Sequence, residues 1–115
     1  MRLGGVYETR GDSICDAAGF LLAFKRLPNA PLFSVKLAVD KARTAAVSKR
    51  DTKAFEEMVN GGKLSLLSAG EIVCIEGGVF IMREGHMLGG IGVSGVKSYE
   101  DGSIARHALG DFMTE

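Results

Sequence analysis

The feature that most constrains the fold is a series of short apolar runs separated by tight glycine-containing turns. Residues 72–75, 79–82 and 87–94 alternate with a period of two, which predicts three strands. The connecting turns, at residues 76–78 and 83–86, are far too short for the crossover that joins parallel strands. These strands are therefore expected to pair antiparallel.

Two further strands are predicted in the first half of the chain. Asp16 and Gly19 mark a turn inside the apolar segment 13–25, so one strand should lie on each side of it. The second strand is apolar on both faces, which is typical of a strand that is covered on two sides. Residues 26–31 contain both prolines and are expected to form a loop.

Three helices are predicted from apolar residues that recur every three or four positions. The first has Ser34 as its expected N-cap and a narrow stripe of small side chains, namely Val35, Ala38, Val39, Ala42, Ala45 and Ala46. The second should start at Asp51 or Thr52 and stop at Gly61. The last should start at Ser98 and bury Ile104, Ala105, Ala108, Leu109 and Phe112. The order of elements predicts an α+β fold with a five-stranded antiparallel sheet and flanking helices.

Length and charge narrow the possible functions. A chain of 115 residues is expected to form a single domain, residues 1–115. Equal numbers of basic and acidic residues, 14 of each, argue against a nucleic-acid or anionic-membrane partner. No apolar run approaches the length of a membrane helix, and no leader opens the chain. The two cysteines lack metal or redox spacing, which favours reduced thiols in a cytoplasmic protein.

Gly90, Gly92 and Gly95 spell G-x-G-x-x-G, the fingerprint of dinucleotide-binding loops. That motif needs a second parallel strand ending in an acidic residue about 20 positions later. The residues after Gly95 are predicted to be helical and leave no room for such a strand. Nucleotide binding of this type is therefore excluded. Glycines inside a strand indicate a bend or a close approach, and either a packed helix or a flat ligand could provide it.

Several short motifs occur along the chain in a characteristic order: Asp16-Ala17-Ala18-Gly19, Arg26, Asn29-Ala30, residues 41–45, Gly77-Gly78, residues 89–95, Asp101 and Ile104-Ala105. In this combination, over residues 12–110, the sequence resembles the GlcG/HbpS haem-binding family. The same family supplies the C-terminal domain of PduO-type corrinoid adenosyltransferases. Two departures are visible. Relatives usually carry a helix before the first strand, whereas only residues 1–11 precede it here, so either the chain is naturally short or its start has been lost. The second departure is Tyr99-Glu100, which replaces the Glu-Gln that relatives tend to carry before Asp101.

The resemblance implies a profilin-like fold, haem or another flat tetrapyrrole as ligand, and assembly into a homo-oligomer. It also implies a role in haem handling, redox sensing or cobalamin-linked metabolism. The family has no agreed set of catalytic residues, so none is assigned. The residues expected to bind a ligand are Lys41, Thr44, Gly90, Gly92, Ser94, Gly95 and Asp101.

These residues suggest a small polar pocket. Lys41, Thr44 and Asp101 could line it together with the backbone at Ser94 and Gly95. The N-terminus of the last helix, near Ser98, would favour a carboxylate or a haem propionate there. Two other classes of function stay open: an enzyme or enzyme accessory that acts on a small carboxylate or hydroxylated metabolite in the same pocket, and a structural assembly module.

Haem iron is held by His, Cys, Met or Tyr. The candidates of the first three kinds within the predicted elements and turns of residues 12–110 are His86, His107, Cys15, Cys74, Met58, Met82 and Met87. His86 is expected to be exposed at a turn and His107 to lie at the edge of the last helix's apolar stripe or outside it. The cysteines are expected to be inert core thiols, and the methionines to fill the core or a contact surface. No axial ligand can be named from the sequence. Motifs for metal sites and for a serine nucleophile are also missing.

Overall fold

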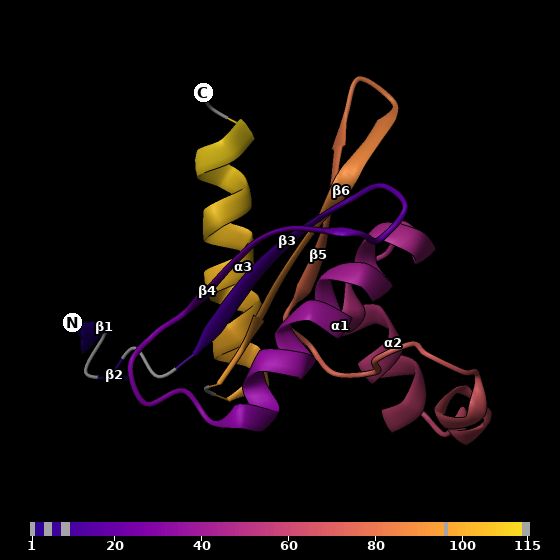
Figure 1. The fold of residues 1–115 in the computed structure, drawn as a ribbon. Helices are drawn as coiled ribbons and strands as arrows, with labels where there is room; N and C mark the ends of the chain where they lie inside the picture. The colour runs from indigo at the N-terminus through magenta and orange to yellow at the C-terminus, as the bar shows by residue number, and fades with distance from the viewer. Residues whose placement is uncertain (1, 4–5, 8–9, 96, 114–115) are drawn as a thin grey trace.

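The structure is a computed structural model that describes residues 2–3, 6–7, 10–95 and 97–113. Its elements follow one another in the order β1 Arg2–Leu3, β2 Val6–Tyr7, β3 Gly11–Asp16, β4 Leu21–Arg26, α1 Leu32–Ser48, α2 Thr52–Asn60, the 3₁₀ helix η1 Leu64–Ser68, β5 Gly78–Arg83, β6 His86–Ser94 and α3 Ser98–Met113 (Figure 1).

The main sheet has the strand order β4-β3-β6-β5, and every neighbouring pair is antiparallel. β1 and β2 form a separate two-stranded ladder. Figure 1 shows α1 and α2 on one side of the main sheet and α3 on the other. The predicted α+β class, with an antiparallel sheet and flanking helices, is confirmed.

The prediction of a fifth strand in this sheet, at residues 72–75, is wrong. The backbone N–H of Val73 donates to Thr44 Oγ1 of α1 at 3.0 Å, and that of Glu76 donates to Glu56 Oε1 of α2 at 3.2 Å. Helix side chains therefore hold this segment, although its side-chain pattern is that of a strand. The profilin-like arrangement inferred together with five strands stays a prediction.

The glycines of β6 allow α1 to lie directly on the sheet. A Cβ at Gly92 would overlap the Ala38 carbonyl oxygen and lie 2.6 Å from the Ala42 nitrogen, and a Cβ at Gly90 would overlap the Ala42 carbonyl oxygen. The alanines of α1 that face these glycines are fully buried. Close packing of a small-residue helix, one of the two explanations considered for the glycines, is confirmed. It accounts for the glycines at positions 90 and 92 of the G-x-G-x-x-G motif without a bound nucleotide.

The other face of the sheet is only half covered. Val79 and Ile81 of β5 and Ile91 and Val93 of β6 form a buried cluster with Ala105 of α3. β3 and β4 lie beyond the reach of this helix. The interpretation of β4 as a strand covered on two sides is therefore wrong, because β4 is an edge strand and most of its side chains are exposed.

The helix boundaries agree with the sequence except at the start of α1. Its N-cap is Pro31, and the expected cap Ser34 is a buried residue of the helix. α2 starts after Asp51 and ends before Gly61, as predicted. α3 starts at Ser98, as predicted.

Candidate functional site

A groove of about 840 Å³ runs between the uncovered part of the sheet and α3. Its floor comes from outward-facing residues of three strands, with Ile14 of β3, Ala23 of β4 and Ile91 of β6 in one cross-strand row. Its wall comes from α3, including Ile104 and Ala108. The floor is therefore flat and largely apolar, as expected of one side of a pleated sheet.

The groove exists because α3 packs on β5 and β6 alone. Ile14 keeps 42% of its surface exposed and Leu22 keeps 65%, although both belong to the apolar pattern of the β3–β4 hairpin. Apolar side chains that stay exposed around a concave surface are typical of a binding or association site.

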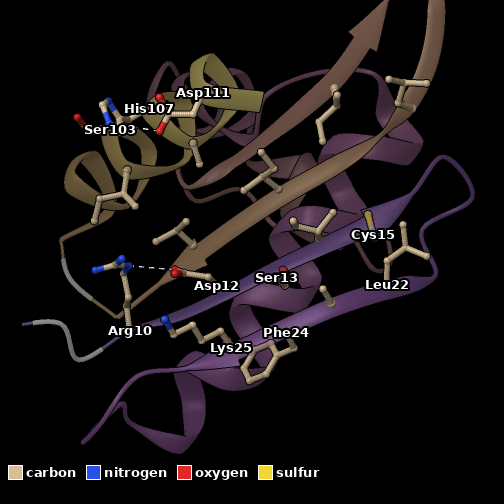
Figure 2. A pocket seen from close by; sticks show the side chains of 18 residues that line it. Arg10, Asp12, Ser13, Cys15, Leu22, Phe24, Lys25, Ser103, His107 and Asp111 are labelled. Atoms are coloured by element: carbon tan, nitrogen blue, oxygen red, sulfur yellow. Dashed lines mark hydrogen bonds and ion pairs between the residues drawn. The ribbon is translucent and has the colours of Figure 1, made fainter. Parts of the chain in front are cut away.

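Charged side chains lie at two places along the groove, as Figure 2 shows. Arg10, Asp12 and Lys25 form one group: Arg10 Nε donates to Asp12 Oδ1 at 3.0 Å, and Lys25 lies opposite Asp12 in the strand pair. Among the described residues that line the groove, this end carries two cationic side chains and one carboxylate. On α3, His107 Nε2 lies 3.7 Å from Asp111 Oδ2, and both residues line the groove.

The residues predicted to bind a ligand lie elsewhere. None of the seven is among the residues that line the groove. Lys41 and Asp101 do meet: Lys41 Nζ lies 3.2 Å from Asp101 Oδ2 and 3.0 Å from the Val93 carbonyl oxygen. Their side chains are only 1% and 2% exposed. Burial lowers the pKa of Lys41, and the nearby Asp101 carboxylate opposes this shift.

This buried ion pair joins α1 to α3 around the end of the sheet. Lys41 passes close to Gly77, where a Cβ would lie 2.6 Å from Lys41 Nζ. Glu76 lies nearby, and its Oε2 accepts a hydrogen bond from Arg106 Nη1 of α3 at 3.0 Å. The arrangement fixes the first turns of α3 against the rest of the fold.

The remaining predicted residues are buried around the same contacts. Thr44 Oγ1 accepts a hydrogen bond from the backbone N–H of residue 73. Ser94 is buried at the end of β6, and Gly90 and Gly92 face α1. Gly95 has a φ of 141°, which favours glycine there. Whether any of the seven contacts a ligand stays a prediction.

Of the candidate iron ligands, His107 and Cys15 line the groove. Cys15 is 1% exposed and packs with Ala42 and Ala46 on the α1 side of the sheet. Burial raises the pKa of its thiol, which disfavours the thiolate form that binds metals. His86 is exposed at the β5–β6 turn, as predicted. Within the described residues, no group of three His, Cys, Asp or Glu side chains could hold a metal ion.

Sequence reasoning missed most of the groove. Arg10, Asp12, Lys25 and Asp111 were not selected, because nothing local marks them as neighbours. One signal was available: β4 is apolar on both faces, and at the edge of the sheet it lies beyond α3, which covers β5 and β6. Reading that strand as an edge strand would have pointed to an exposed apolar surface.

The comparisons with known proteins agree on one family. GlcG of Escherichia coli is 38% identical over 82 residues, which cover 71% of this chain and 61% of GlcG. The chain thus spans less than two thirds of that relative's length. A crystal structure of a complex between PduOC and haem superposes with a TM-score of 0.79 at 34% identity and covers 88% of this chain and 76% of PduOC.

A second solved structure, the protein ORFY of Klebsiella pneumoniae, superposes with a TM-score of 0.83 at 26% identity and covers 92% of this chain and 76% of ORFY. None of the helices in the described ranges is long and apolar enough to cross a membrane. The family model described as haem-degrading protein HbpS-like matches residues 13–110. The chain therefore belongs to the HbpS-like family.

Proposed function

We propose that this protein binds haem, or a closely related flat tetrapyrrole, in the groove between the β3–β4 face and α3. The observation that carries the proposal is the groove itself. Its volume of about 840 Å³ lies within the range of roughly 300–1,000 Å³ that is usual for small-molecule and cofactor sites.

The residues present fit a haem in shape and in charge. A flat sheet floor that includes Ile14, Ala23 and Ile91 matches an apolar macrocycle. The cationic side chains of Arg10 and Lys25 match the two propionates, because cationic side chains form charge-assisted hydrogen bonds with carboxylates. Bound haem would supply an iron centre for one-electron chemistry. The similarity to PduOC, which was crystallised with haem, gives independent support.

The role that follows from such binding is haem handling or redox sensing. A small protein with an open groove can take up and release a tetrapyrrole, whereas a catalyst needs positioned acid, base or nucleophile groups. Lys41 and Asp101, the best candidates for such groups, are engaged with each other and with the Val93 carbonyl. We therefore place haem binding ahead of turnover of a small carboxylate. A cytoplasmic location stays a prediction.

We further propose that the protein forms homo-oligomers. Two apolar residues at the start of α1, Leu32 and Phe33, are 77% and 72% exposed, and Phe20 at the β3–β4 turn is 71% exposed. Large apolar side chains exposed to this extent are typical of association surfaces.

Haemin titration of the purified protein tests the proposed site. The wild type should develop a Soret band that saturates at one haem per chain. Ala108→Trp should weaken binding at least tenfold, because Ala108 is an exposed residue of the groove wall and an indole there would fill the groove. Ala69→Trp is the matched control, because Ala69 is exposed beside η1 and does not line the groove. Equal haem affinity in both variants would place the haem elsewhere.

A further inference from the structure

Among the side chains that the structure describes in the groove, His107 is the one suited to bind the iron of a haem. Besides His107, the described residues that line the groove include one other side chain of a kind that binds haem iron, the buried Cys15. Its thiol belongs to the α1 side of the sheet, so it does not face the groove. Met82, Met87 and Tyr99 lie outside the lining residues.

His107 lies on the side of α3 that faces the groove. Ser103, His107 and Asp111 are spaced four residues apart and all line the groove, so they form one stripe along the helix. His107 is the middle member of this stripe. Its side chain is 83% exposed, so a ligand that enters the groove can reach it.

The position of His107 along the groove can be worked out from the chain geometry. α3 returns alongside the sheet from the end where β6 stops (Figure 1). From Ser98 to His107 the helix advances about 13 Å, at about 1.5 Å per residue. From Ser94 back to Gly90 the strand covers about 13 Å, at roughly 3.3 Å per residue. For a helix that starts level with Ser94 and runs parallel to β6, these lengths put His107 near the level of Gly90 and Ile91.

The group formed by Arg10, Asp12 and Lys25 lies nearer to the start of α3. Asp12 pairs with Val93 and with Lys25 across the sheet, one residue from the end of β6. Arg10 is bonded to Asp12 at the same end. About 10 Å, or three strand residues at roughly 3.3 Å each, therefore separates the cations from the level of His107. A haem bridges such a separation from its central iron to its propionate edge.

Asp111 completes the arrangement. Histidines that bind metals usually direct their second ring nitrogen toward a carboxylate or a carbonyl, which orients the ring and raises its basicity. His107 Nε2 lies 3.7 Å from Asp111 Oδ2, so one ring nitrogen faces a carboxylate and the other is directed elsewhere. The spacing of one helical turn keeps the two side chains together.

We infer that His107 is the axial ligand of the haem iron, with the propionates at Arg10 and Lys25 and with Asp111 orienting the imidazole. This inference rests on the proposed haem binding and goes beyond it, because it fixes which residue meets the iron and which way the haem lies.

Resonance Raman spectroscopy of the ferrous haem complex tests the ligand directly. The wild type should show an iron–histidine stretching band, and His107→Ala should lose it. His86→Ala is the matched control, because His86 is the other histidine of the chain and lies at the β5–β6 turn outside the groove. It should keep the band. Added imidazole should restore a histidine-like Soret spectrum to His107→Ala. Circular dichroism should show that both variants are folded.

The outcomes separate this inference from the proposal on which it rests. A band that persists in His107→Ala, or that disappears in His86→Ala, overturns the assignment of His107 while haem binding stands. If the wild type shows no spectral change with haemin, the proposed function itself fails.

The orientation of the haem has its own test. Lys25→Glu should weaken haemin binding about tenfold at low salt, whereas Lys36→Glu on the exposed side of α1 should leave it unchanged. Equal affinity in the two variants would overturn the placement of the propionates.

Discussion

Replacement of Lys41 by methionine tests how α1 and α3 are held together around the end of the sheet. The Lys41–Asp101 pair has an N–O distance of 3.2 Å, which corresponds to an attraction of about 5 kcal/mol at an effective dielectric constant of about 20. Methionine keeps most of the aliphatic stem but removes the charge. The Asp101 carboxylate, 2% exposed, would then stay buried without its cation. Loss of one member of a buried pair costs about 3–5 kcal/mol, so we expect the free energy of unfolding to fall by about 4 kcal/mol.

Urea unfolding followed by circular dichroism measures this loss. With a slope of about 2 kcal/mol per molar urea, the midpoint should fall by about 2 M. Lys36→Met is the matched control, because it makes the same chemical change on the same helix. Lys36 forms a surface pair with Asp40 and is 80% exposed. Such pairs contribute about 0.5 kcal/mol or less, so its midpoint should move by about 0.25 M at most.

A double variant separates the loss of the pair from a simple loss of packing. Lys41→Met with Asp101→Leu removes both charges and should recover most of the stability, because apolar replacements of buried ion pairs are often neutral or stabilising. If Lys41→Met costs less than about 1 kcal/mol, or if the double variant is less stable than Lys41→Met alone, the pair does not hold α3 as reasoned here.

Three other measurements follow from the same structure. Gly92→Ala should lower the free energy of unfolding by about 2–3 kcal/mol, because the added Cβ would overlap the backbone of α1. Gly110→Ala, in an exposed turn of α3 with open space around it, should instead raise the free energy of unfolding by about 0.5–1 kcal/mol. Equal effects of the two substitutions would contradict the close packing of α1 on β6. Burial lowers the pKa of Lys41 below 10.5, so the folded protein releases this proton at lower pH than the unfolded chain does. The free energy of unfolding of the wild type, measured by urea titration relative to that of Lys41→Met, should therefore rise as the pH approaches 10.5. A difference that falls with pH would reverse the assigned shift. Phe33→Asp should convert an oligomer into smaller species in size-exclusion chromatography with light scattering, whereas Lys36→Asp should not, and a monomeric wild type would refute the proposed association.

The candidate site could be predicted only in part. The α1–β6 contact was foreseeable, because alanines at helical spacing and glycines in a strand are both visible in the printed sequence. The motif positions suggested that Lys41 and Asp101 lie close together, lining one polar pocket, but they did not predict that the two side chains pair with each other and are buried. His107 was a candidate without a position. Only the fold shows that it lies beside an open apolar surface, with Asp111 one turn away.

The sequence alone determined the local structure: the β3–β4 and β5–β6 hairpins, the starts of α2 and α3, and the α+β class. These follow from turn residues and side-chain periodicity, which act over a few positions. The tertiary structure decided what depends on distant partners. Side chains of α1 and α2 hold residues 73–76 through hydrogen bonds to the backbone, and β4 lies at the edge of the sheet. Because α3 is wide enough to cover only β5 and β6, it also left the groove open beside β3 and β4.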